Sequence, residues 1–285
     1  MSLSWNKNLR NRLIVGFTGG PLILACAWLG GWFFFGFILV LLIVSLHEMH
    51  RIGEHLGFVK HDIIGYIFST AFLVGVYSYS ALHLDLSASH VYFIVIAYIT
   101  IILIAAVISN RDNQLLEVSY RCLTTLYLSF FLGSLLLLRE SPYNSEYTTG
   151  GKYTVTVFLS IFILDTAAYF AGKIFGSHPL FPRISPKKTV EGAIGGLIGA
   201  ASTLVIVKYV FFNELSLVHA LVIGTIIGVA GQIGDVLESF IKRKAGVKDS
   251  SSILPGHGGV LDRFDSLIFA SPFVYFYVWF VIYAV

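Results

Sequence analysis

Long apolar runs alternate with short polar segments along most of this chain. A helix needs about 20 mostly apolar residues to cross the hydrocarbon core of a bilayer. The pattern predicts nine membrane-spanning helices, at residues 13–29, 32–47, 63–82, 91–108, 119–138, 153–175, 190–212, 217–240 and 266–285. The expected fold class is an all-α polytopic membrane protein.

Only Gly30 and Gly31 separate the first two predicted helices. Residues 7–27 also resemble a signal peptide, because basic residues precede an apolar stretch that ends in the small residues Ala25-Cys26-Ala27. Hydrophobicity resumes at once and continues to Leu46, so we favour a retained helix.

The composition agrees with a surface that faces lipid. Of the 285 residues, 56% are hydrophobic and only 12% are charged, whereas about a quarter of the residues of a soluble domain are charged. The net charge of +3 is too small to indicate nucleic-acid binding. Both cysteines lie in apolar runs, where they form no disulfide framework and no CxxC metal pattern.

The basic residues indicate the orientation. With a cytoplasmic N-terminus and nine alternating spans, one side of the membrane would carry 16 of the 19 Lys and Arg residues. These are Lys7, Arg10, Arg12, Arg51, Lys60, Arg111, Arg121, Lys173, Arg183, Lys187, Lys188, Lys242, Arg243, Lys244, Lys248 and Arg263. Since cytoplasmic loops are enriched in Lys and Arg, we expect the N-terminus inside, the C-terminus outside and the polar site facing the cytoplasm.

Polar chemistry concentrates in the second half of the chain. We expect residues 1–138 to form a transmembrane scaffold of about five helices. Residues 153–285 are expected to form a catalytic region of about four helices with two basic cytoplasmic loops, at residues 173–189 and 242–265.

Three predicted helices in this region carry acids near their cytoplasmic ends. Asp165 lies in one helix, and Asp235 and Glu238 share a face of another because they are three residues apart. Asp262 and Asp265, also three apart, precede the last predicted helix. Charged groups at membrane depth usually mark a function or a buried pair.

Two interpretations of these acids remain open. Mg²⁺ binds one or two carboxylates together with substrate phosphates, so Asp235 and Asp262 are candidate metal ligands, with Glu238 and Asp265 as further candidates. The alternative is that the acids form structural salt bridges with nearby Lys and Arg residues. Lys173, Lys242 and Arg263 are close enough in sequence to serve as partners.

Basic and glycine-rich segments on the same side suggest phosphate binding. Ser185 and Pro186 are expected to open a helix, as an N-cap followed by proline at the first helical position. Lys187 and Lys188 would then lie beside a helix N-terminus that attracts anions. Residues 254–259 form a glycine-rich turn whose N–H groups could approach a phosphate. The basic loops could equally contact anionic lipid headgroups.

A family resemblance rests on three motifs. Residues 239–265 closely resemble the signature of the phosphatidate cytidylyltransferases, or CDP-diacylglycerol synthases, and residues 165–173 and 185–192 also look like that family. The signature positions that match are Lys242, Arg243, Lys248, Asp249, His257, Gly258, Gly259, Asp262, Arg263 and Asp265. The motifs span about the last 125 residues, and the first half matches only in being apolar and similarly long.

The resemblance implies CTP and phosphatidic acid as substrates and CDP-diacylglycerol and pyrophosphate as products. It implies a Mg²⁺-dependent site held by acids matching Asp235 and Asp262, with a monovalent cation such as K⁺ as a candidate for a second position. On this hypothesis six basic groups surround the phosphates: Lys173, Lys188, Lys242, Arg243, Lys248 and Arg263. His257 would donate a hydrogen bond, and further substrate contacts would come from Asp165, Ser185, Asp249, Gly258 and Gly259.

The reaction also predicts the shape of the site. The phosphate of a lipid in the inner leaflet and a water-soluble nucleotide must meet, so we expect a cavity about 10 Å below the cytoplasmic surface, open to water and to lipid. A transporter of phosphorylated or nucleotide substrates is the alternative, although transporters place their sites near the midplane between repeated halves. The paired-Asp motif of transferases that use CDP-diacylglycerol and an alcohol is absent. Helix packing leaves a homodimer open.

Overall fold

Long helices make up most of the chain in a computed structural model that describes residues 18–58, 62–82, 84, 88–109, 113–141, 146–253 and 258–283. Within these residues, eight helices are long and apolar enough to cross a membrane. They are α2 (Gly31–His55), α3 (Ile63–Ser80), α4 (Ala88–Ser109), α5 (Gln114–Glu140), α6 (Tyr147–Phe175), α7 (Val190–Val210), α8 (Leu217–Lys244) and α9 (Leu261–Tyr277), which continues as the π-helical turn η1 (Val278–Ile282). The all-α polytopic membrane fold is therefore confirmed.

The first predicted span, at residues 13–29, is described only from residue 18 onward, as the shorter apolar helix Thr18–Leu29. The Gly-Gly break that follows is held by the far end of α5. Arg139 of α5 donates hydrogen bonds of 2.6 and 2.7 Å to the carbonyl oxygens of Ala27 and Trp28, in the last turn of the helix Thr18–Leu29. Glu140 accepts a hydrogen bond of 2.8 Å from the N–H of Gly31, where α2 begins. Two adjacent side chains thus satisfy the helix ends on both sides of the break.

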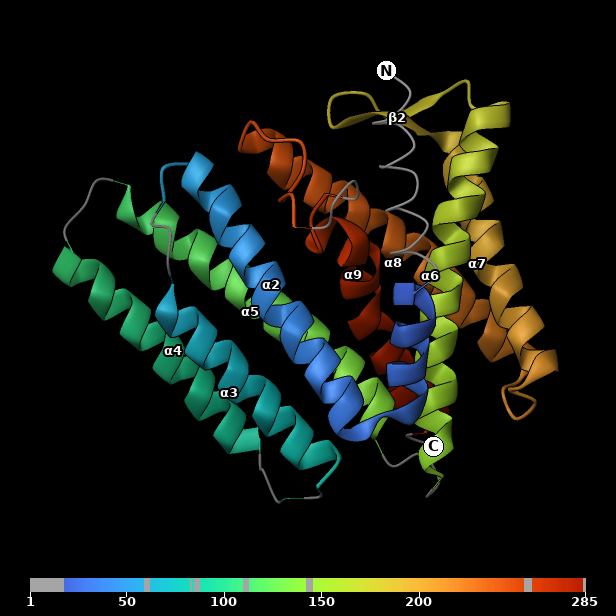
Figure 1. The fold of residues 1–285 in the computed structure, drawn as a ribbon, viewed down its shortest axis with the longest axis horizontal. Coiled ribbons are helices and arrows are strands. Elements are labelled where there is room, and N and C mark those ends of the chain that lie inside the picture. The colour runs from blue at the N-terminus through green and yellow to red at the C-terminus, as the bar shows by residue number, and fades with distance from the viewer. Residues whose placement is uncertain are drawn as a thin grey trace.

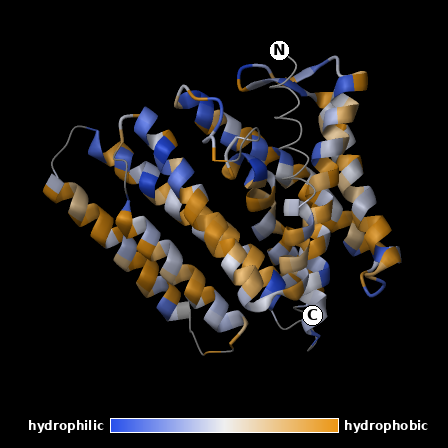
Figure 2. Cartoon of the chain, viewed as in Figure 1, coloured by the Kyte–Doolittle hydropathy of each residue, from blue (hydrophilic) through white to orange (hydrophobic). Residues whose placement is uncertain are grey.

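Successive helices run in opposite directions, so their connections gather at two ends of the bundle (Figure 1). The connections α2–α3, α4–α5, α6–α7 and α8–α9 lie at one end, which we call the polar end. Figure 2 shows hydrophilic residues concentrated at the polar end and hydrophobic residues through the middle of the bundle. This alternation agrees with the predicted order of spans, while the cytoplasmic side of the membrane remains a prediction.

The hydrophobic core joins the two halves of the chain. One continuous buried cluster contains Leu42 of α2, Leu132 of α5, Ile227 of α8 and Ile268 of α9. Helix α5 contacts both α3 and α9, and α6, α7, α8 and α9 pack in sequence. A smaller cluster around Phe68 ties α3 and α4 to α5. The region expected to be a scaffold therefore packs directly against the region that carries the motifs.

Glycines allow close packing between α6, α7 and α8, as their spacing suggests. A Cβ added at Gly195 of α7 would lie 2.4 Å from the Cβ of Ala171 in α6. A Cβ at Gly224 of α8 would lie 2.6 Å from the Cα of Ala201 in α7. These glycines therefore serve close helix packing.

The prediction that Ser185 and Pro186 open a helix is wrong. Residues Ser185–Thr189 form strand β2, which pairs antiparallel with β1 (Pro179–Phe181). Helix α7 begins only at Val190, and the side chain of Thr189 caps it by accepting a 3.1 Å hydrogen bond from the N–H of Gly192. Pairing with β1 competes successfully with the local Ser-Pro signal, because it gives the backbone partners across the hairpin.

Among the helix ends that differ from expectation, two change the placement of predicted site residues. Helix α8 continues to Lys244, so Lys242 and Arg243 belong to a helix and not to a loop. Helix α9 begins at Leu261, so Asp262 and Asp265 lie in its first turns and do not precede it. Both extensions bring charged residues onto defined helix faces at the polar end.

Candidate functional site

A cavity of about 580 Å³ opens at the polar end between α6, the β1–β2 hairpin, α8 and α9. Its lining joins segments that are far apart in sequence. Eight of the residues predicted for the site line it: Asp165, Lys173, Ser185, Lys188, Asp235, Asp262, Arg263 and Asp265. The sequence thus identified most of the polar wall of one cavity.

Part of the cavity lining is apolar. Leu164, Ala168 and Tyr169 of α6 and Leu180 of the hairpin contribute to the lining. The side of α6 that carries Tyr169 is also open, because that residue is 61% exposed. The cavity therefore combines charged groups with apolar lining residues, and α6 contributes both.

Lys188 and Asp235 form an ion pair across the cavity, from β2 to α8. Both side chains remain partly accessible, at 28% and 37%. Their elements are positioned by the cap at Thr189 and by the packing of α7 on α8. This pair is therefore available to a ligand that enters the cavity.

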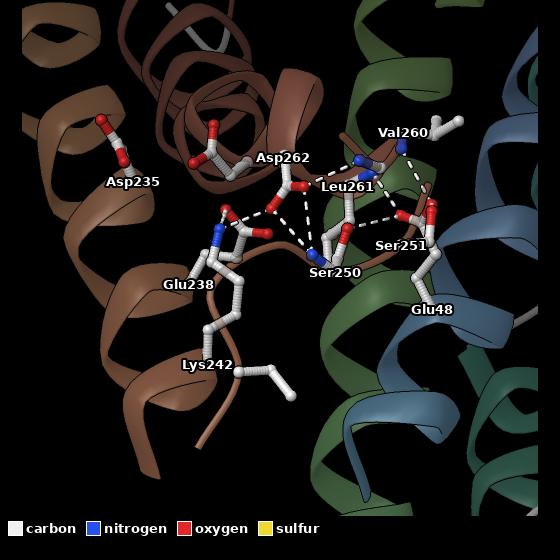
Figure 3. Close-up of polar contacts among 12 residues, drawn as sticks. Glu48, Asp235, Glu238, Lys242, Ser250, Ser251, Val260, Leu261 and Asp262 are labelled. Atoms are coloured by element: carbon white, nitrogen blue, oxygen red, sulfur yellow. Dashed lines mark hydrogen bonds and ion pairs between the residues drawn. The ribbon is translucent and has the colours of Figure 1, made fainter. Parts of the chain in front are cut away.

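Asp262 lies at the centre of a denser network (Figure 3). Its carboxylate pairs with the ammonium group of Lys242, which also lies 3.1 Å from Glu238. The backbone N–H groups of Gly259 and Ser250 donate to Asp262 at 2.8 and 3.1 Å. Lys242, on α8, and the loop before α9 therefore converge on one carboxylate.

These contacts bear on both interpretations of the acids, as metal ligands and as partners in structural salt bridges. Asp235 offers a partly exposed carboxylate, and Glu238 Oε1 is a buried oxygen with no hydrogen-bond partner among the described residues. The oxygens of Asp262 already accept several hydrogen bonds, so a metal at Asp262 would compete with Lys242. Within the described residues, no group of three or more His, Cys, Asp or Glu side chains is already arranged to hold a metal.

Several predicted site residues lie outside the cavity. Arg243 is exposed and donates a 2.9 Å hydrogen bond to the carbonyl of Val247, and Lys248 is exposed. Asp249 lines a second, smaller cavity of about 210 Å³ together with Arg51 and His55 of α2. His257 lies outside the described residues. Membership of the signature therefore does not by itself place a side chain in the cavity.

The glycine pair of the signature has a local explanation. Gly258 adopts a φ of 86°, a conformation that other residues rarely adopt. At Gly259 an added Cβ would lie 1.8 Å from Ser250 Oγ and 2.7 Å from Glu48 Oε1. The first glycine permits the turn, and the second permits close approach to two polar side chains.

Gly259→Ala is therefore expected to lower the free energy of unfolding by about 1–3 kcal/mol and to displace the turn that holds Asp262. Thermal unfolding followed by circular dichroism in detergent measures the first effect. Gly36→Ala is the control, because a Cβ at Gly36 of α2 meets no atom within 4 Å. Equal melting temperatures for the two variants would contradict the explanation.

Glu48 is a site residue that sequence reasoning missed. This α2 residue is fully buried, yet its carboxylate accepts hydrogen bonds from the N–H groups of Val260 and Leu261 at 2.9 and 2.6 Å. It also accepts hydrogen bonds from the hydroxyls of Ser250 and Ser251. A charged residue in an apolar helix was the only signal in the sequence, and its partners lie more than 200 residues away.

Comparisons with known proteins match this chain to cytidylyltransferases. A family model described as the cytidylyltransferase family matches residues 10–281. A phosphatidate cytidylyltransferase from Staphylococcus saprophyticus is 50% identical over 124 residues, which cover 43% of this chain and 47% of the relative. One from Bacillus subtilis is 46% identical over 127 residues, covering 45% and 47%. In these matches the chain spans about half the length of its curated relatives.

Proposed function

This chain belongs to the cytidylyltransferase family, and we propose that it transfers CMP from CTP to phosphatidic acid. The products would be CDP-diacylglycerol, a precursor for phospholipid synthesis, and pyrophosphate. The observation that carries the proposal is the cavity at the polar end of the helical bundle, where acidic, basic and apolar side chains line one space. The relatives are named phosphatidate cytidylyltransferases, and this name indicates phosphatidic acid as the lipid substrate.

The reaction depends on stabilising the negative charge of the phosphates more than on proton transfer. A phosphate oxygen of the lipid, already anionic near neutral pH, would form a bond to the α-phosphorus of CTP. The bond from that phosphorus to the oxygen bridging to the β-phosphate would break, and pyrophosphate would leave with the electron pair. Positioning and electrostatic stabilisation dominate phosphoryl-transfer catalysis. Lys173, Lys188 and Arg263 line the cavity and would bind the phosphates.

We further propose that Mg²⁺ binds to acids at this cavity. Asp235 and Asp262 would hold it, with Glu238 and Asp265 as auxiliary groups, and K⁺ is a candidate for a second position. Mg²⁺ usually binds through one or two carboxylates plus phosphates, so the absence of a ready cluster among the described residues agrees with a site completed by the nucleotide. The ion would neutralise charge on the phosphates. Lys242 would keep its contact with Glu238.

The membrane supplies one substrate and the cytoplasm the other. We place the polar end in the cytoplasm, because CTP is water-soluble and most basic residues are predicted on that side. Tyr169 and Leu180 in the cavity wall support entry of a lipid headgroup from the inner leaflet, with the acyl chains remaining in the bilayer. A site at one end of the bundle suits this chemistry better than transport across the midplane.

Pyrophosphate release by the purified chain in mixed micelles tests the proposal. Release is expected only when phosphatidic acid, CTP and Mg²⁺ are all present, and ATP should not replace CTP. Addition of K⁺ in a parallel sample tests the second cation. No release from folded protein under both conditions would reject the enzymatic function, and uptake of labelled nucleotide into vesicles would then be measured.

A further inference from the structure

We propose that Glu48 is a positioning residue for the reaction centre. Its carboxylate binds two stretches between and at the ends of α8 and α9, Ser250–Ser251 and Val260–Leu261, which we call the two ends of the turn. Through them it sets the position of Asp262. The kinetic part of this inference rests on the proposed function, whereas the structural part does not.

Glu48 is a buried acid held by neutral groups. It is 0% exposed. Its Oε1 accepts from the hydroxyl of Ser251 and the N–H of Val260, and its Oε2 accepts from the hydroxyl of Ser250 and the N–H of Leu261. Burying a carboxylate is costly unless several hydrogen bonds compensate for lost hydration. Four donors, two at each end of the turn, provide that compensation.

The donors of the turn are divided between two carboxylates. Ser250 gives its N–H to Asp262 and its hydroxyl to Glu48. At the other end, Gly259 gives its N–H to Asp262, while Val260 and Leu261 give theirs to Glu48. Figure 3 shows Glu48 and Asp262 approaching this stretch of backbone from two sides. A shift of the turn away from Glu48 would therefore change the hydrogen bonds of Asp262.

Glu48 would influence the reaction only through Asp262. It does not line the cavity, whereas Asp262 does. It belongs to α2, which also contacts α5 and α9. Because α2 is a long packed helix, it provides a rigid support for a turn that would otherwise depend on α8 and α9 alone.

The simpler alternative is that Glu48 only caps α9. An acid near a helix N-terminus stabilises the helix by binding its free N–H groups. A cap of this kind would affect thermal stability, but it would leave turnover below the melting temperature unchanged. The two roles therefore differ in a kinetic measurement.

Glu48→Gln is the variant that separates them. Either orientation of the amide places an NH₂ group against the N–H of Val260 or of Leu261, while the neighbouring serine hydroxyl can rotate and accept. One backbone donor therefore loses its acceptor. We expect kcat to fall about 10- to 100-fold, because small misplacements of a reacting group have effects of this size. Amides of residues 248–262 should exchange hydrogen faster.

Glu140→Gln is the matched control. Glu140 is also buried, and it accepts hydrogen bonds from the N–H of Gly31 at 2.8 Å and the hydroxyl of Tyr147 at 3.0 Å, at the opposite end of α2. It should lower the melting temperature while leaving kcat and the exchange of residues 248–262 unchanged. Ser251→Ala removes a single hydroxyl from Glu48, and it serves as the second variant if Glu48→Gln does not fold.

Pyrophosphate release and hydrogen exchange measured by mass spectrometry, in the same micelles, decide the question. Faster exchange of residues 248–262 together with reduced kcat, in Glu48→Gln but not in Glu140→Gln, supports the proposal. Unchanged kcat overturns the positioning role even if exchange accelerates, and unchanged exchange overturns the structural link. If the wild-type protein releases no pyrophosphate, the proposed function fails separately, and exchange alone still tests the link.

Discussion

Asp262→Asn is expected to lower pyrophosphate release by on the order of 10³-fold or more while the helical bundle stays folded. Asparagine removes the charge that pairs with Lys242 and replaces an acceptor oxygen by an NH₂ group. That group would face a donor, since both oxygens of Asp262 accept hydrogen bonds from Ser250 or Gly259. Lys242 retains Glu238 as a partner, so the fold is not left with an unpaired buried charge.

Asp62→Asn is the matched control for this experiment. Asp62 is a buried aspartate that pairs with Arg121 and caps α3 by accepting a 3.0 Å hydrogen bond from Gly65. It does not line the cavity. The Asp62→Asn variant should be less stable but should retain turnover per folded molecule. Turnover is measured as the initial rate of pyrophosphate release by protein purified by gel filtration. Activity of Asp262→Asn within tenfold of wild type would leave Asp262 with only a structural role.

Lys188→Ala is expected to lower kcat/KM for CTP about 10- to 100-fold. A charge-assisted hydrogen bond contributes about 1.5–3 kcal/mol, and each 1.4 kcal/mol corresponds to about a factor of ten. Lys188 is the cavity lysine that pairs with Asp235, and both groups remain partly accessible. Removing Lys188 would take away a phosphate contact and leave Asp235 without its counter-charge.

Lys152→Ala provides the comparison. Lys152 also forms an ion pair between separate segments, 2.8 Å from Glu214 in the connection between α7 and α8. It lies near the N-terminal end of α6, far along that helix from the cavity residues. Steady-state kinetics with CTP as the varied substrate should show less than about a twofold change for this variant, since an exposed ion pair contributes little. Equal effects of both substitutions would remove Lys188 from the phosphate site.

The predicted spans agree with the observed helices because crossing a bilayer imposes a local requirement on sequence. Each span needs a continuous apolar stretch of sufficient length. The predicted helix at residues 190–212 became α7, Val190–Val210, and that at residues 63–82 became α3, Ile63–Ser80. Boundaries were less predictable where polar residues extend a helix, as Lys242 and Lys244 do in α8.

The motifs of the second half predicted most of the cavity wall. Asp165, Asp235 and Asp265 lie on three different helices, and their placement at one depth followed from helix geometry and the order of spans. Other residues of the signature were harder to assign. Arg243 and Lys248 share the signature with Asp262, yet they are exposed outside the cavity. Their proximity in sequence to the site does not determine the direction of their side chains.

The class of fold, the approximate spans and the set of acids and bases could be predicted from the sequence, because they depend on composition and helical spacing. The folded arrangement was needed to show that Ser185 belongs to a β-hairpin and that Glu48 contacts the residues around Asp262. The first depends on pairing with β1, and the second on contact between residues 213 positions apart. Such contacts form only when distant helices pack, since local propensity contains no information on which backbone donors a buried carboxylate will meet.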